Sequence, residues 1–284
     1  MQASGFAGWE WVVRLGAFAG IFAVMATWEA LAPRRVRIFP RRVRWVTNLS
    51  LVALNGLVVR LVFPVAAVGF AAIAAERGWG LLNAFEVPFW PAFALSLLAL
   101  DLAIYLQHVM FHAVPLLWRL HRVHHADPDF DVTTGARFHP IEIVLSMLIK
   151  FAAIVTLGPA PLAVLIFEVL LNATAMFNHS NVRMPLGVDH VLRWLVVTPD
   201  MHRVHHSSED HETNSNFGFN MPVWDRLFGT YKDQPDAGHD AMTIGIRDLR
   251  APRQAAALPG MLWLPFVGKV SDYAINRRTW KKSL

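Results

Sequence analysis

Histidine is concentrated in three short stretches, at spacings that place imidazoles on one side of a helix. His108 and His112 lie four residues apart, and the pentapeptide HRVHH occurs twice, at 121–125 and 202–206. Side chains three or four residues apart share a helix face, with their Cβ atoms about 5–6 Å apart. Imidazole is the commonest metal ligand, and no other chemistry needs so many histidines so close together. The sequence therefore predicts a polyhistidine metal site.

The alternative is that these histidines form no dedicated metal site, because a single histidine is more often a surface or core residue than a ligand. A histidine-rich pH sensor or an adventitious metal site would then take its place. The exact repeat of HRVHH favours a built site, since chance duplication in so hydrophobic a chain is improbable. The sequence has no cysteine, which excludes a disulfide framework, a thiolate metal site and a cysteine nucleophile.

The composition is that of an integral membrane protein. Of the 284 residues, 55% are hydrophobic and only 17% are charged, and 11 tryptophans and 19 phenylalanines suit a chain that meets lipid and its interface. The formal net charge is +5, but the basic residues cluster beside apolar segments. This pattern fits anionic lipid headgroups better than nucleic acid, so we expect no nucleic-acid partner.

Apolar runs must form the elements that position the histidines. A helix that spans a membrane needs ~20 apolar residues, and we judge the length of each run by this number. We expect spans at about 9–32, 46–75 and 89–112, and a thin or re-entrant hairpin over 143–177 that is split by a Gly-Pro-Ala-Pro sequence. The second run contains Arg60, and an arginine within a span normally faces protein, water or a partner rather than lipid. A functional role for Arg60 and a structural pair with an acid such as Asp101 are both open.

Charge predicts the orientation of these segments. Six arginines between residues 34 and 44 place that loop on the cytoplasmic side, whereas the loop 76–88 carries two glutamates and one arginine and suits the outer side. We therefore expect an all-α integral membrane protein, a bundle of about four to five transmembrane or hairpin helices with a histidine-rich cytoplasmic cap. The cap would comprise 113–142 and 178–248, and 249–284 would be an interfacial or basic tail.

The motifs HVMFH, HRVHH, RFHPIE, NHSN, PDMHRVHH and WDRLFGTY, in this order, resemble the fatty acid hydroxylase superfamily, also called the sterol desaturase family. Its members are membrane-bound non-haem diiron enzymes, and the resemblance extends from about Asp101 to Tyr231. It implies about four spans under a cytoplasmic cap that houses two iron ions. It also implies ten metal ligands: His108, His112, His121, His124, His125, His139, His179, His202, His205 and His206.

Metal-bound histidines usually donate their other N–H to a carboxylate or a carbonyl. The acids beside the motifs are candidates for this role, and a turn role is the alternative for one of them, Asp127. We favour Asp200, which lies two residues before His202. His211, in the segment DHETNSNFG, is a further candidate, whereas His190 and His239 match no motif and are expected at the surface. The candidates beside the ligands are Asp101, Asp127, Glu142, Asp200, Asp225 and His211.

The resemblance implies O₂-dependent hydroxylation or desaturation of a C–H bond in a lipid, such as a sterol, a fatty acyl or an alkylglycerol lipid. No catalytic residue separate from the metal ligands is expected. The sequence shows no haem- or flavin-binding pattern, so electrons would come from a separate donor, such as a reductase with a ferredoxin or a cytochrome b5-like protein. We expect a bacterial inner membrane, with the histidines on its cytoplasmic side.

Two other function classes remain open on the residues alone. A metal transporter or sensor would place its ligands within the spans, near the middle of the bilayer. A metallohydrolase would leave one metal position open and would need a general base, often a carboxylate, beside it. The positions of the ligands and of the acids therefore separate these classes from an oxygenase.

Overall fold

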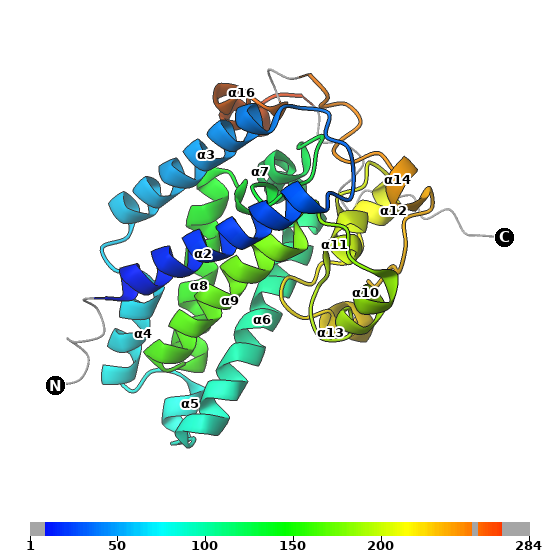
Figure 1. Ribbon diagram of the computed structural model, residues 1–284. Coiled ribbons are helices and arrows are strands. Elements are labelled where there is room, and N and C mark those ends of the chain that lie inside the picture. Colours follow the sequence, from blue (N-terminus) through cyan, green and yellow to red (C-terminus); the bar gives the residue numbers. More distant parts are fainter. Residues whose placement is uncertain (1–8, 252–254, 269–284) are drawn as a thin grey trace.

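Long apolar helices make up most of the protein in this computed structural model, which describes residues 9–251 and 255–268. Within these ranges the regular elements are helices, and two isolated β-bridges join loops. Five segments are long and apolar enough to cross a membrane (Figure 1). They are α2 (Glu10–Leu31), Arg41–Ala84 with helices α3 to α5, α6 (Phe89–Ala113), α8 (Pro140–Leu157) and α9 (Pro161–Asn178). The expected all-α, multi-pass membrane protein is confirmed.

The second apolar run, expected over 46–75, is not one continuous helix. It consists of α3 (Arg41–Val62) and α4 (Ala67–Glu76), and the short helix α5 (Leu81–Ala84) follows. The break falls at Phe63 and Pro64, because a proline lacks the N–H that would continue the helix and restricts the residue before it. The chain therefore bends between α3 and α4 (Figure 1).

The hairpin of α8 and α9 lies at the centre of the helix bundle. Each helix has 18 residues, or about 27 Å at ~1.5 Å per residue, close to the ~30 Å of a hydrocarbon core. Ile154 of α8 and Val164 and Phe167 of α9 are buried in one apolar cluster with residues of α4 and α6. The turn between them is held close to the α4–α5 loop, since a Cβ on Gly80 would lie 2.1 Å from the backbone nitrogen of Gly158.

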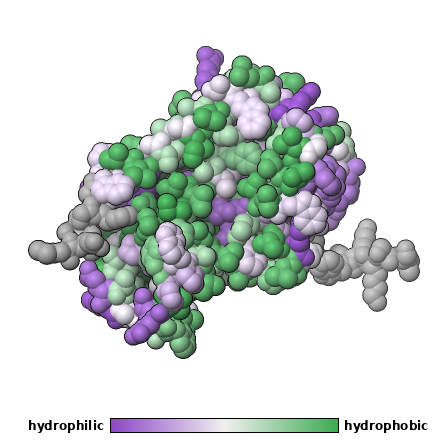
Figure 2. Space-filling model, turned by 60° about the horizontal axis from the view of Figure 1, so that its bottom comes forward, coloured by the Kyte–Doolittle hydropathy of each residue, from purple (hydrophilic) through white to green (hydrophobic). Residues whose placement is uncertain are grey.

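The cap is made of short helices gathered at one end of this bundle, where α6 ends and α8 begins (Figure 1). Seen from the opposite end, apolar residues cover most of the surface (Figure 2). The cap helices are α7 (Pro115–His125), η1 (Thr134–Ala136), α10 (Leu186–Leu192), α11 (Pro199–His205), α12 (Asp210–Thr213), α13 (Val223–Leu227), α14 (Gly238–Ala241), α16 (Leu258–Trp263) and η2 (Leu264–Phe266).

The segment with α16 and η2 packs on the cap and on α3. Met261 and Leu264 are buried against Trp118 and Val123 of α7, whereas Trp263 and Phe266 remain 64% and 56% exposed. This short segment therefore combines core packing with an exposed aromatic edge. The basic residues expected in the tail, Arg277, Arg278, Lys281 and Lys282, lie outside the described residues.

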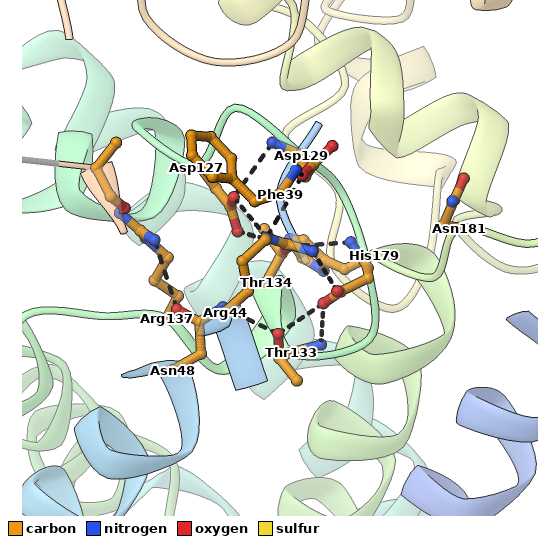
Figure 3. A network of polar contacts seen from close by, with 12 residues as sticks. Phe39, Arg44, Asn48, Asp127, Asp129, Thr133, Thr134, Arg137, His179 and Asn181 are labelled. Atoms are coloured by element: carbon orange, nitrogen blue, oxygen red, sulfur yellow. Dashed lines mark hydrogen bonds and ion pairs between the residues drawn. The ribbon is translucent and has the colours of Figure 1, made fainter. Parts of the chain in front are cut away.

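The arginine-rich loop between α2 and α3 turns inward to the cap. Arg34 pairs with Asp240 at 2.5 Å, and Arg35 donates to the carbonyl of Met242 at 2.8 Å. Arg44 is buried and forms the centre of a polar network (Figure 3). A loop that the sequence marks only as strongly cationic thus joins the first two spans to the cap.

Arg44 connects α3 with the loop that follows α7. Its guanidinium donates to Asp127 at 2.6 Å and to Thr134 at 3.0 Å, and it also pairs with Asp131 (Figure 3). Asp127 in turn accepts from the backbone N–H of Asp129 at 3.2 Å, which is the turn role considered from the sequence. Because this loop begins two residues after His125, the network fixes the chain directly after the second histidine stretch.

The suggested pair of Arg60 with Asp101 is wrong. Arg60 lies on an exposed face of α3, whereas the buried carboxylate of Asp101 accepts a hydrogen bond from the indole nitrogen of Trp224 at 2.8 Å. No ion pair joins the two residues among those found in the described part of the chain. Asp101 is therefore bound by the cap segment around Trp224, a contact that the order of residues along the chain could not reveal.

Candidate metal centre

Nine histidines converge between the ends of the spans and the cap. His108 and His112 belong to the last turns of α6, and α7 begins directly after it with Pro115 at its first turn. His179 follows the last residue of α9. All nine rings are at most 5% exposed. The remaining six lie on α7 and at α11: His121, His124, His125, His202, His205 and His206.

The nine divide into two groups, in each of which the ligand nitrogens lie within 4.8 Å of one another. The first group has five members, and the second has four. Both HRVHH stretches contribute to both groups. The first consists of His108, His112, His121, His125 and His205, and the second consists of His124, His179, His202 and His206.

Backbone carbonyls fix the tautomer of three of these rings. The Nδ1 atoms of His108, His179 and His205 lie 2.8, 2.8 and 2.7 Å from the carbonyl oxygens of Phe217, Ala175 and Ser215. A carbonyl oxygen can only accept, so each Nδ1 carries the proton and donates. Each Nε2 is therefore left with its lone pair, the form in which imidazole binds a metal.

Several Nε2 atoms of these rings have no satisfactory partner among the described residues. The Nε2 atoms of His108, His121 and His205 are buried without a hydrogen bond among the described residues. The Nε2 of His179 lies 3.1 Å from the Nε2 atoms of both His124 and His202, although it has no proton to donate. Buried polar atoms are normally satisfied. Lone pairs that converge from several sides are satisfied by a cation, so the residues fit a metal site.

Burial keeps these imidazoles neutral. It lowers the pKa of His121 and of His179 to about 3, and burial together with neighbouring imidazoles holds the pKa values of His124 and His205 well below the usual value. The charged form is disfavoured in a dry interior and beside like charges. The rings are consequently unprotonated, and ready to bind a metal, throughout the physiological pH range.

Glu142 is the carboxylate that contacts a ligand directly. Its Oε1 lies 2.6 Å from Nδ1 of His121, and both side chains are buried. Glu142 lies in the first turn of α8, so this bond also ties α8 to α7. A carboxylate in this position orients a metal-bound imidazole and raises its basicity.

The preference for Asp200 is not supported by the structure. Its carboxylate pairs with Arg203, three residues later on α11, and lies 3.6 Å from Arg34. Two arginines therefore take the acceptor capacity that the sequence analysis assigned to His202. Asp225 does not contact a ligand ring but supports one indirectly. Its carboxylate accepts hydrogen bonds from the backbone N–H groups of Phe217 and Gly218, both at 2.7 Å. It thereby fixes the backbone whose carbonyl holds His108.

His139 lies outside both groups. Its Nδ1 accepts from the N–H of Ile141 at 3.2 Å and caps the start of α8, and its Nε2 lies 3.2 Å from the carbonyl of Leu262. The carbonyl contact gives Nε2 the proton and leaves Nδ1 as the acceptor, so this ring satisfies itself within the protein. We therefore count nine of the ten implied ligands at the candidate centre.

The remaining histidines differ from one another in their surroundings. His211 is exposed and lies 2.6 Å from Asp236, which Lys232 also contacts. His190 is exposed, as expected. His239 was expected at the surface, and this is wrong: it is 6% exposed, with Nε2 3.7 Å from Asp200. The arginine-rich loop and α11 cover it, a contact between segments far apart in the sequence.

The segment after the third histidine stretch contributes contacts that the motifs did not identify. The Oδ1 of Asn214 lies 3.2 Å from Nδ1 of His112, and the hydroxyl of Thr213 lies 3.4 Å from Nδ1 of His125. The only signal in the sequence was the run of small polar residues directly after that stretch. This run therefore contacts the first group at two of its five rings.

Comparisons with known proteins agree with this geometry. The sequence profile described as fatty acid hydroxylase matches residues 93–230. An ornithine lipid hydroxylase, OlsE, of Rhizobium tropici is 34% identical over 52% of this chain and 46% of its own length. Alkylglycerol monooxygenases of Xenopus tropicalis and Homo sapiens are 31% and 28% identical, each over 54% of this chain and 34% of their own length. No solved structure matches. The chain thus covers half or less of the length of these relatives.

Proposed function

We propose that the chain belongs to the fatty acid hydroxylase family and that it is a membrane-bound diiron enzyme that uses O₂ to hydroxylate a C–H bond of a membrane lipid. The observation that carries this proposal is the convergence of nine buried histidines into two adjacent groups. Two iron ions bound there would supply the activation of O₂ and the oxidation of the substrate. Imidazole also suits zinc, copper and nickel, so the choice of iron rests on the family.

The protein's own part is to hold the ligand rings and to keep water away from them. Each group draws its rings from at least three helical segments, and the rings are fixed by Glu142, Asn214 and the carbonyls described above. Phe217 is buried with its ring centroid 5.0 Å from that of His112. An apolar, closed surrounding of this kind protects a reactive oxidant from water and from side reactions.

A lipid chain has a candidate approach beside Phe219. This ring is half-buried, and its centroid lies 6.2 Å from that of His108 and 6.4 Å from that of His202. It lies equally far, 6.4 Å, from the ring of His179, so it adjoins both groups. Its neighbours on the chain contact α6 and α9, and the approach would lead from the bilayer between these spans to the metals.

The two other function classes fit the arrangement less well. The ligands lie at helix ends and in the cap rather than in the middle of the spans, where a transporter would bind its ion. A hydrolase would need a carboxylate free to act as a base. Among the described residues, the carboxylate found on a ligand ring is that of Glu142, and it bonds to Nδ1, away from the converging nitrogens.

We propose further that the electrons come from a separate redox protein, such as a ferredoxin with its reductase or a cytochrome b5-like protein. We also propose that the metal centre lies on the cytoplasmic side of a bacterial inner membrane. The basis is the arginine-rich loop of 34–44, which adjoins the cap. A reporter inserted near Asn83, in the short helix α5, should report the outer side, and a cytoplasmic signal there would reverse the orientation.

One experiment tests the enzyme proposal directly. The protein is purified in detergent, its iron and zinc are measured per chain, and the lipids of cells with and without the gene are compared by mass spectrometry. We expect about two iron ions per chain and a lipid species heavier by one oxygen atom, both lost in His205→Ala. Zinc in place of iron, a lipid profile that does not change with the gene, or full activity of His205→Ala would each contradict the proposal. A lipid lighter by two hydrogen atoms would indicate desaturation instead.

A further inference from the structure

Two short cap helices, α10 and α13, expose an apolar surface that no other described element covers. We call it the apolar cap face. The exposed fraction of Leu195 is 71%, that of Leu227 is 66% and that of Trp194 is 60%. Monomeric soluble proteins rarely expose so many large apolar side chains together. The apolar cap face consists of Leu186, Val188, Val191, Trp194, Leu195, Val223, Leu227 and Phe228.

The acids of these helices point inward. Asp189 is buried and pairs with Arg193, and Asp225 is buried and holds backbone N–H groups. No acidic residue is therefore exposed within 185–195 or 223–229. On the other side of the cap, around α12 and α14, Glu209, Asp236 and Asp240 are exposed (Figure 1). The exposed Asp233 pairs with Arg193 at 2.5 Å and therefore lies at the border between the two sides. The cap thus has one apolar and one acidic side.

Arg226 joins the two helices in the manner of a residue at a membrane interface. Its guanidinium lies 3.7 Å from the ring centroid of Trp194 and 4.0 Å from that of Tyr231, and it donates to the carbonyl of Arg193 at 3.2 Å. The charge is held by aromatic faces and a carbonyl, so the arginine stem can lie along apolar surface. Tryptophan and arginine are both typical of the boundary between lipid and water.

The contacts of α13 place it beside the middle of a spanning helix. Trp224 donates to Asp101 of α6 at 2.8 Å, and the hydroxyl of Tyr105, also of α6, lies 2.8 Å from that of Thr230. These two α6 residues precede His112 by 11 and 7 residues, or about 16 and 10 Å along the helix axis. Figure 1 shows α10 and α13 alongside α6, below the level at which α6 ends.

The segment that leads to α13 also reaches α9. Asn178 donates to the carbonyl of Phe219 at 2.9 Å, and Thr174, one turn further into the span, donates to the side chain of Asn220. The chain from 217 to 231 therefore lies against two spanning helices at once. Phe228 of the apolar cap face stacks on Tyr105 of α6 with ring centroids 5.5 Å apart, so the face adjoins this spanning helix.

We propose that the apolar cap face is embedded in the lipid leaflet next to the metal centre, so that α10 and α13 lie in the membrane and not in water. Its occupant is lipid, because the face adjoins a spanning helix, exposes no acid and has an arginine–tryptophan edge. This refines the expectation of an aqueous cap over 178–248. It rests on the multi-pass membrane architecture and not on the proposed reaction. It also brings Phe219 within reach of acyl chains.

The absence of cysteine from the whole sequence makes a direct test simple. Single cysteines are introduced at two exposed positions of the face, Leu195→Cys and Leu227→Cys, and at two exposed positions of the acidic side, Gln234→Cys and Ala237→Cys. Each full-length, metal-loaded protein is spin-labelled and placed in bilayers of phosphatidylethanolamine and phosphatidylglycerol. Relaxation of the label by O₂, which concentrates in lipid, is compared with relaxation by a water-soluble nickel chelate.

We expect labels at 195 and 227 to be relaxed by O₂ and protected from nickel, with the reverse at 234 and 237. Nickel access at 195 and 227 equal to that of the controls would overturn the proposal. Protection from both reagents would overturn it as well, since a second copy or another protein would then cover the face. Retention of metal shows that a variant is folded, and Val191→Cys replaces any that is not. The result does not depend on activity, so it stands apart from the proposed reaction.

Discussion

Oε1 of Glu142 lies 2.6 Å from Nδ1 of His121, in a place from which water is excluded. The two residues come from consecutive helices of the cap and the bundle, and the bond points the Nε2 of His121 toward four other imidazoles. A metal ligand is thus oriented by a residue of a membrane-spanning segment. The position of this ring therefore depends on the packing of the helix bundle.

Glu142→Gln should weaken metal binding without unfolding the protein. The amide keeps the size of the side chain but replaces the carboxyl group that contacts Nδ1 of His121, and loss of such a partner typically costs ~10–100-fold in metal affinity or activity. Metal titration of the purified protein measures the effect. Glu76→Gln, at an exposed position at the end of α4, is the matched control and should bind metal normally. Equal affinities in the two variants would show that Glu142 does not support the ligand.

His139→Ala and His179→Ala should differ sharply. The ring of His179 belongs to the second group, so its loss should release metal from that group. His139 caps α8, so its loss should leave both metals bound and lower stability by about 1 kcal/mol. Metal per chain and thermal unfolding of both variants measure the contrast. If His139→Ala lost as much metal as His179→Ala, His139 would have to be counted as the tenth metal ligand.

Arg44→Met should strongly destabilise the cap. It leaves the buried carboxylates of Asp127 and Asp131 without their cation, and breaking a buried ion pair from one side typically costs ~3–5 kcal/mol. Limited proteolysis of the loop after α7 should become faster. Arg42→Met, two residues away at an exposed position, is the control and should change nothing. Unchanged protection in Arg44→Met would mean that the network does not hold this loop.

The metal-free protein should lose stability as the pH falls below about 6.5. In the unfolded chain a histidine takes up a proton near pH 6.5. In the folded protein burial lowers the pKa of His121 and His179 to about 3, so these two residues stay unprotonated in the folded state at pH 5 to 8. Stability is therefore complete above pH 6.5 and declines as the pH falls toward 3, more steeply for each buried histidine.

Unfolding of the metal-free protein in detergent at pH 5, 6, 7 and 8 tests this expectation. The unfolding temperature should be the same at pH 7 and 8 and lower at pH 6 and 5. A variant without His190, which is exposed, should show the same profile as the unaltered chain. A temperature that is constant across the range would mean that the histidines are not buried in the metal-free state.

The fold class and the clustering of the histidines were predictable because their signals are local. A span is a contiguous apolar run, and a histidine stretch such as 121–125 presents its rings by helical spacing alone. The contacts of single side chains were less predictable. Asp200 lies near His202 in sequence, but Arg203 is closer to its carboxylate in space. The break at Pro64 was visible in the sequence, yet the apolar run around it indicated one span.

Only the tertiary structure decided how the ligands divide. In 121–125, His121 and His125 enter the first group and His124 enters the second. In 202–206 the assignment is reversed, with His205 in the first group and the outer pair in the second. In each stretch the two outer histidines, four residues apart, point in the same direction. The inner histidine points in a different direction, so each stretch contributes rings to two sites. Which site receives which ring depends on how α7 and α11 face each other, and identical pentapeptides carry no information about that.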